Sequence, residues 1–258
     1  MKDDNQTTHQ PLKWLESATA TWQDVGNFIN EQPHAILPLG ATEQHGPHLP
    51  LNTDTLLADE LAKRIADQSG GLVLPALPIG YSWVWRDHPG TLTFSFNTFR
   101  AVIKDIAHSL DREGVKALLI LSGHAANVGP LKYTVRELAD EIELSILHCC
   151  YPGLSDIIEN DAQSEQWMAS AFHAEEFETS MMLALRPDLV QMDKAVREYP
   201  PHSIQYSNSS LPMGNLSESG VFGDATVADA ERGEAWLKGS SQKITELWEQ
   251  FLKEHEVS

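Results

Sequence analysis

Cysteine and basic residues are both scarce in this sequence. The two cysteines are adjacent, at positions 149 and 150, so they form no disulfide framework and lack the spacing of a structural zinc site. The 18 Lys and Arg are outnumbered by 37 Asp and Glu, which gives a formal net charge of -19. This imbalance argues against nucleic acid or an anionic membrane surface as a partner.

Long hydrophobic runs and several well-known catalytic signatures are also missing. No run approaches the ~18 apolar residues of a membrane span, and residues 1–10 are polar, unlike the apolar core of a secretory leader. The sequence contains no Walker-type phosphate loop, Gly-x-Ser-x-Gly elbow, Gly-x-Gly-x-x-Gly turn or His-Glu-x-x-His motif. We therefore expect a cytoplasmic protein that is not a P-loop NTPase, a serine hydrolase or a dinucleotide enzyme.

Apolar periodicity switches repeatedly between strand-like and helix-like patterns. The predicted strands are short apolar runs, with the weakest pattern in the third: 34–39, 72–75, 91–96, 116–121 and 144–149. The predicted helices carry one apolar stripe each: 55–67, 97–113, 130–142, a helix around 177–185 and a C-terminal helix. This alternation predicts an α/β fold, with a mostly parallel central sheet flanked by helices in a single domain over residues 1–258.

One long segment breaks this alternation. Residues 195–224 are rich in Ser, Pro and Asn and show no periodicity. A loop of this length inside a compact domain is usually functional or disordered. We predict that it lies at the active site or at a subunit interface.

Histidines and carboxylates follow two of the predicted strands. Glu43 and His45 come after strand 34–39, and His124 comes after strand 116–121. In open α/β sheets, ligands bind beyond the carboxyl ends of the strands, so these groups should emerge at one edge. Glu43 and His45 point the same way if their segment is extended. Asp54 precedes a predicted helix, where its carboxylate suits either this site or a helix N-cap.

A third cluster of the same chemistry lies at residues 173–180. Phe177 and Met181 belong to a helical stripe, and Glu178 lies between these apolar positions, which draws it toward the interior. Together with His173, this cluster adds an imidazole and a carboxylate to the two strand-end groups. Neutral imidazole and carboxylate without thiolate are the ligands of a divalent-metal hydrolase rather than of a closed structural zinc site.

One run of the sequence resembles the signature of the creatininase (creatinine amidohydrolase) family: Leu37 to Asp54, which reads LPLGATEQHGPHLPLNTD. The resemblance spans nearly the whole chain and continues through five further segments: 88–91, Gly123-His124, Asn127, His173 with residues 178–180, and 220–224.

The resemblance implies a creatininase-like fold with two divalent metal ions per subunit, Zn, Mn or Fe. The ligand positions carry over in pairs: Glu43 and His124 on one ion, His45 and Glu178 on the other, and Asp54 bridging both. Two ions ~3.5–4 Å apart can activate a shared water for attack on an amide carbonyl. The family is also homo-oligomeric, commonly a hexamer.

The catalytic positions match the family less completely than the ligands do. His173 occupies the position of the proton donor to the leaving nitrogen, a task that suits an imidazole. Creatininase proper has a glutamate two residues after the equivalent of His124, and this chain has Ala126 there. Because an alanine cannot orient water or substrate, the substitution argues against creatinine itself. The wider family, which includes deformylases and a peptide-processing enzyme, cleaves C–N bonds of amide type.

The sequence therefore predicts a metal-dependent amidohydrolase that acts on a small cyclic amide or formamide. Trp85, His88 and Asn127 are the candidate substrate contacts. One alternative is a binuclear phosphoesterase, which uses the same ligands, although Arg86 and Lys132 are the only basic residues close to the motifs. The other alternative is a catalytically silent metal-binding protein of the same family.

Overall fold

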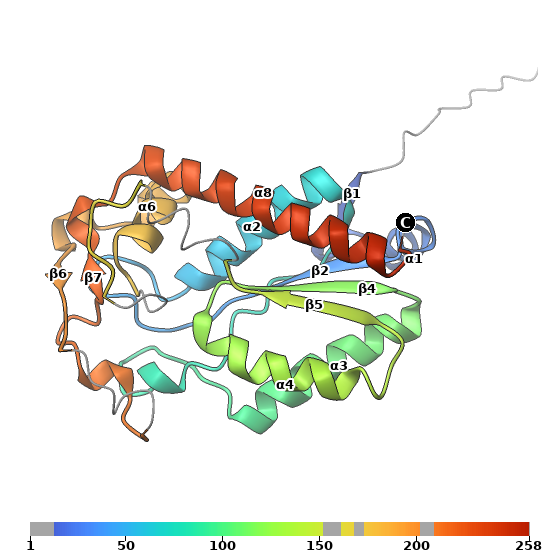
Figure 1. Ribbon diagram of the computed structural model, residues 1–258, viewed down its shortest axis with the longest axis horizontal. Coiled ribbons are helices and arrows are strands. Elements are labelled where there is room, and N and C mark those ends of the chain that lie inside the picture. Colours follow the sequence, from blue (N-terminus) through green and yellow to red (C-terminus); the bar gives the residue numbers. More distant parts are fainter. Residues whose placement is uncertain (1–12, 152–160, 168–172, 202–208, 258) are drawn as a thin grey trace, which may run out of the picture.

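The computed structural model describes residues 13–151, 161–167, 173–201 and 209–257 (Figure 1). Residues 1–10 and the middle of the predicted 195–224 loop lie outside these ranges. No helix among the described residues is long and apolar enough to cross a membrane.

Five strands form a central sheet in which every pair is parallel. The strands lie in the order β1-β3-β2-β4-β5. Their bounds are β1 Trp14–Glu16, β2 His34–Leu39, β3 Gly71–Val73, β4 Ala117–Ser122 and β5 Ser145–Cys149. The two central strands, β2 and β4, are buried at every residue, as their continuously apolar sequences predict. The mostly parallel α/β sheet predicted from the sequence is confirmed.

Helices cover both faces of the sheet (Figure 1). One face packs against α2 Thr53–Ser69, α6 Glu176–Leu185 and α8 Ala230–Glu254, and the other against α1 Trp22–Glu31, α3 Phe96–Glu113 and α4 Val128–Leu138. Alternation along β2 divides its side chains between the two faces: Ile36 joins the α2, α6 and α8 side, and Leu37 joins the other. Because every strand pair is parallel, the carboxyl ends of the strands lie at one edge of the sheet.

Two of the strand predictions need correction. Residues 91–96 do not form a strand, because only Leu92 pairs, in an isolated bridge with Thr42, and α3 already begins at Phe96. Leu92 and Phe96 are also exposed rather than buried against a sheet. The strand predicted at 144–149 is present as β5, but it is mostly half-buried rather than buried because it lies at the edge of the sheet.

The first strand and the first helix were not predicted. β1 has three residues, too few to show a period. The start of α1 does carry a local signal: Thr21 and Asp24 form a reciprocal capping box. The described ends of the 195–224 segment contain a two-stranded antiparallel ladder, β6 Arg197–Glu198 with β7 Gly223–Asp224.

Candidate metal centre

The predicted ligands converge at the carboxyl edge of the sheet. β2 and β4 are neighbours that end in register, Leu39 opposite Ser122. Glu43 and His45 follow β2, and His124 follows β4, as the sequence predicts. Two helix starts supply the other members: Asp54 in the first turn of α2 and Glu178 in the first turn of α6. All five side chains are buried.

The absence of a side chain at two glycines lets α2 approach the strand ends. A Cβ at Gly40 would overlap Thr55, and a Cβ at Gly123 would overlap the carbonyl of Asp54. These glycines follow β2 and β4 directly. Any larger residue would push the first turn of α2 away from the sheet, and Asp54 with it.

The donor atoms form two triads that share Asp54. In the first, Nδ1 of His124 lies 3.2 Å from Oε1 of Glu43 and 3.2 Å from Oδ2 of Asp54. In the second, Nε2 of His45 lies 3.0 Å from Oδ1 of Asp54 and 3.7 Å from Oε2 of Glu178. The two oxygens of one carboxylate thus face two separate groups of donors, the arrangement expected of a bridging ligand.

The structure also excludes one of the two roles that the sequence allowed for Asp54, the helix N-cap. Asn52, not Asp54, occupies the N-cap of α2, and the helix begins at Thr53, two residues before the predicted start. The carboxylate of Asp54 is directed at His45 and His124 instead. Helix capping therefore does not account for Asp54.

Backbone carbonyls fix which nitrogen each histidine presents to the carboxylates. Nδ1 of His45 lies 3.2 Å from the Glu43 carbonyl, and Nε2 of His124 lies 3.2 Å from the Tyr81 carbonyl. Because a carbonyl only accepts, these nitrogens carry the hydrogens. Nε2 of His45 and Nδ1 of His124 are left for the carboxylates or for a cation. Metal-bound histidines are commonly oriented by such a hydrogen bond.

Burial and mutual attraction shift the pKa of these groups in opposite directions. Burial opposes the charged form of His45, but the charge and hydrogen bond of Asp54 prevail and raise the pKa of His45 to about 10. Burial likewise opposes the charge on His124, yet Glu43 and Asp54 hold its pKa well above the ordinary value. Without a metal, protonated imidazoles balance the carboxylates. A bound cation takes over that role by displacing the protons.

The carboxylates themselves fit a cation. Both oxygens of Glu43 and Oδ2 of Asp54 are buried and accept no hydrogen bond of good geometry in the described structure. Buried anionic oxygens are costly unless an opposite charge compensates them. Burial raises the pKa of Glu178 to about 7, against the opposing charge of His45. A divalent ion in each triad would hold all three carboxylates in their ionised form.

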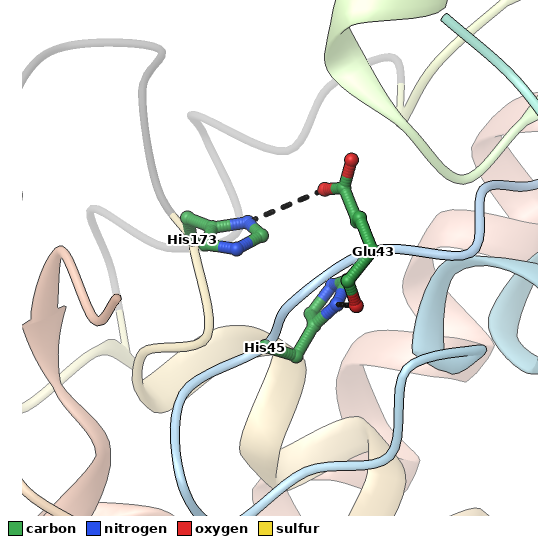
Figure 2. A group of neighbouring side chains, drawn as sticks. All are labelled: Glu43, His45 and His173. Atoms are coloured by element: carbon green, nitrogen blue, oxygen red, sulfur yellow. Dashed lines mark hydrogen bonds and ion pairs between the residues drawn. The ribbon is translucent and has the colours of Figure 1, made fainter. Parts of the chain in front are cut away.

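His173 lies beside the two triads rather than within them. Figure 2 shows its ring next to Glu43, with Nδ1 3.8 Å from Oε1 of that carboxylate. Its other nitrogen, Nε2, donates to the Gln44 carbonyl at 2.8 Å. Burial and the positive charge of His45 keep the pKa of His173 well below its ordinary value. The neutral ring therefore presents the unprotonated Nδ1 toward the ligands.

Comparisons with known proteins agree with this geometry. The family model for creatininase, described as creatinine amidohydrolase, matches residues 18–248. The chain belongs to the creatininase family. It is thus an enzyme of a family of metal-dependent amidohydrolases, and both the fold and the family inferred from the sequence are confirmed.

Three relatives illustrate the range of the creatininase family. A creatinine amidohydrolase of Pseudomonas putida is 31% identical over 232 residues, which cover 82% of this chain and 86% of that protein. A mycofactocin precursor peptide peptidase of Mycolicibacterium smegmatis is 30% identical, with 78% of each chain covered. The solved structure of a mutant creatininase of Zn-Zn type superposes with a TM-score of 0.81 at 29% identity, covering 92% and 98% of the two chains.

Of the three candidate substrate contacts, Trp85 lies against His173, His88 lies against Trp85, and Asn127 bonds to the ends of the two central strands. Trp85 is 2% exposed and stacks on His173, with ring centroids 4.1 Å apart. His88 is half-buried beside Trp85. Asn127 is fully buried, and its amide accepts from the Tyr81 N–H and donates to the Gly40 carbonyl and to Ser122. These bonds tie the loop at residue 81 to both strand ends, and substrate contact by Asn127 stays a prediction.

The sequence analysis missed the structural importance of Gln44, the residue between two ligands. Its side chain donates to the Gly220 carbonyl at 3.0 Å and accepts from the Gly46 N–H at 2.9 Å, while its carbonyl holds His173. Gly220 belongs to the 195–224 segment, so Gln44 joins the described end of that segment to the site. Its place in the family signature was the available signal.

Glu175, at the N-cap of α6, is a second buried carboxyl that was not predicted to matter. One oxygen accepts from the Phe177 N–H at 3.0 Å, and Oε1 has no partner in the described structure. Burial raises the pKa of Glu175 to about 8; the Phe177 hydrogen bond opposes this shift, and the charge of Glu178 adds to it. The folded protein therefore binds more protons than the unfolded chain between the unfolded value of 4.5 and about 8. Stability falls as the pH rises through that window.

We expect Glu175→Gln to remove this loss, since the amide keeps an acceptor for Phe177 without a charge. The substitution should stabilise the metal-loaded protein by about 1 kcal/mol at pH 8, which corresponds to a rise in melting temperature of about 2–4 °C. At pH 5 the melting temperature should change little. Thermal unfolding at both pH values measures this, with Glu249→Gln on the exposed side of α8 as the control. An equal shift at the two pH values would contradict the prediction.

Proposed function

We propose that this chain hydrolyses the C–N bond of a small cyclic amide or formamide with two divalent cations per subunit. Zn, Mn and Fe all suit the donor set of imidazole and carboxylate. Glu43 and His124 would hold one cation, His45 and Glu178 the other, and Asp54 both. Bound divalent cations would lower the pKa of a water and polarise the amide carbonyl.

The observation that supports this most directly is the division of Asp54 between the two triads. Its Oδ1 faces His45 and its Oδ2 faces His124, at 3.0 and 3.2 Å. Each triad also contains its own carboxylate, Glu43 or Glu178. A single structural ion would need only one such group, and structural zinc sites close with four ligands rather than sharing one.

His173 is suited to move a proton between the attacking water and the leaving nitrogen. Its Nε2–H donates a hydrogen bond to the Gln44 carbonyl, so Nδ1 is the atom that accepts and releases the transferred proton. The low pKa that burial and His45 impose on His173 favours a ring that takes up a proton only transiently. An imidazole that accepts a proton on Nδ1 and then releases it from the same atom performs general base and general acid steps in turn.

Ala126 separates this chain from creatinine hydrolysis. It lies in the short turn Ala125–Asn127 that follows His124, and the family resemblance places the glutamate of creatininase at this position. The methyl group supplies no oxygen to orient water or substrate. Cleavage of the C–N bond depends on the metal ligands and His173, which are all present. The chain therefore keeps the reaction class of creatininase but acts on a substrate other than creatinine.

A phosphoesterase is less well supported than an amidohydrolase. In the described part of the chain, the carboxylates Glu43, Asp54 and Glu178 form ion pairs with histidines alone. The guanidinium of Arg86 lies over the Trp83 ring, 4.0 Å from its centroid, and Lys132 is exposed on α4. Of the described residues, neither of these two basic side chains is therefore placed to neutralise a phosphoryl group.

We also propose that the chain assembles as a homo-oligomer. The family resemblance implies that this oligomer is a hexamer.

Metal removal and a substrate panel test the proposal. The purified protein should contain about two divalent ions per chain by elemental analysis, since the two triads share one ligand. Dialysis against a chelator should abolish hydrolysis of formamides and lactams, and added zinc or manganese should restore it. The panel includes aryl phosphates. Turnover of phosphates alone would refute the amidohydrolase, and one tight ion without any hydrolysis would favour the silent metal-binding protein.

A further inference from the structure

The ring of His173 needs more support than its hydrogen bond provides. The 2.8 Å hydrogen bond to the Gln44 carbonyl fixes the position of Nε2. The χ2 torsion of histidine has a broad energy profile, so the ring plane can still tilt about Nε2. Tilting moves Nδ1, the atom that faces Glu43 (Figure 2). A proton carrier must keep this atom directed at the reacting groups.

Trp85 supplies a flat surface against that ring. The two ring centroids lie 4.1 Å apart and the planes differ by 21°. This is close stacking, whereas the contact of His173 with His45 is tilted by 43° at 4.5 Å. An imidazole stacked on an indole can slide in its plane but cannot tilt without losing contact area.

The indole is itself held in place. Trp85 forms a small apolar cluster with Met213 and Phe222 that is separate from the two main cores of the described structure. The Phe222 ring meets the indole edge-on at 5.5 Å and 63°, and the Phe222 N–H also donates to the His173 carbonyl at 3.0 Å. The same short segment therefore positions both the tryptophan and the histidine.

We propose that Trp85 is a positioning residue that holds the imidazole plane of His173, so that Nδ1 stays directed at Glu43 and the metal ligands. The inference rests on the proposed role of His173 as the proton carrier. It replaces substrate contact as the main role of Trp85, because an indole that is 2% exposed has almost no surface left for a substrate. The partly buried Val84, Trp167 and Leu216 pack against the same cluster.

Substitutions that keep or remove the flat face test this role. Trp85→Leu should lower kcat by about 10- to 100-fold, the cost of a misplaced catalytic group, with KM and metal content unchanged. Trp85→Phe keeps an aromatic face and should retain at least about half of kcat. Trp83→Leu is the matched control, two residues away in the same turn and packed under Arg86. Should Trp85→Leu not fold, Trp85→Met removes the aromatic face with less loss of volume.

A double-mutant cycle separates this inference from the proposed function. If Trp85 acts through His173, Trp85→Leu should cause no further loss of kcat in a His173→Ala background. Full activity of His173→Ala would refute the proton-carrier role itself. A low kcat in His173→Ala together with an unchanged kcat in Trp85→Leu would refute only the positioning role. A raised KM with normal kcat in Trp85→Leu would overturn it as well, because that result indicates substrate contact.

The stack also has a spectroscopic signature that does not depend on turnover. In the zinc-loaded protein, the ring current of the indole should shift the Cε1–H resonance of His173 upfield. We expect this resonance to move toward its ordinary position in Trp85→Leu and to stay where it is in Trp83→Leu. An unchanged His173 resonance in Trp85→Leu would overturn the inference.

Discussion

Replacing Asp54 by asparagine is expected to empty at least one of the two metal positions and to lower amide hydrolysis by at least ~1,000-fold, more than the ~10–100-fold typical of an outer-shell partner. The amide keeps one oxygen, but its NH₂ group carries hydrogens and cannot bind a cation. Because Oδ1 and Oδ2 face different histidines, at 3.0 and 3.2 Å, either orientation of the amide leaves one triad without its shared ligand.

Elemental analysis after gel filtration, together with steady-state hydrolysis, measures this effect. Asp59→Asn is the matched control, since Asp59 lies on the same helix and pairs with the half-buried Lys63 at 2.9 Å. Surface ion pairs of this kind contribute ~1 kcal/mol at most, so the control should keep its metal and its activity. Two ions and normal turnover in Asp54→Asn would show that Asp54 does not bridge them.

Replacing His173 by alanine is expected to lower kcat by ~100- to 10,000-fold, the usual contribution of a general acid or base. Metal content should not change, because both triads are complete without this ring. The measurements are kcat, KM and metal content of the reconstituted protein. His108→Ala serves as the control, since His108 is a half-buried histidine that pairs with Glu141 on the opposite side of the sheet from α2.

Metal content distinguishes the proton carrier from an alternative role. Glu43, His45 and His173 also place donor atoms within reach of one cation, as the proximity of the three side chains in Figure 2 indicates. Loss of one ion from His173→Ala would therefore mean that His173 is a ligand. Retention of both ions with unchanged kcat would mean that the ring has neither role.

The convergence of the candidate ligands could be predicted because its signals are local. Glu43 and His45 immediately follow an apolar strand, and His124 follows another, so chain order and strand type were enough to bring them to one edge. Glu178 was found because a carboxylate interrupts an apolar helical stripe. The helix bounds were less accurate: α3 begins at Phe96 with Ser95 as its N-cap, one residue before the predicted start.

The failures concern contacts between distant segments. Residues 91–96 have the alternation of a strand, but they form one isolated bridge, between Leu92 and Thr42, and no ladder. The run 144–149 is as apolar as a central strand, yet β5 lies at the edge of the sheet. Strand order is decided by which helices cross over which face, and apolar patterning along one segment carries no information about that choice.

Composition, periodicity and three short motifs by themselves determined the α/β class, the divalent-metal chemistry and the family. These properties depend on residue type and on spacing along the chain, which the sequence states directly. Only the tertiary structure decided that Asp54 divides its oxygens between two triads, that carbonyls select one nitrogen of each histidine, and that Trp85 lies against His173 rather than open to a substrate. Those features join residues from separate strands, helices and loops, and their geometry exists only once the chain has packed.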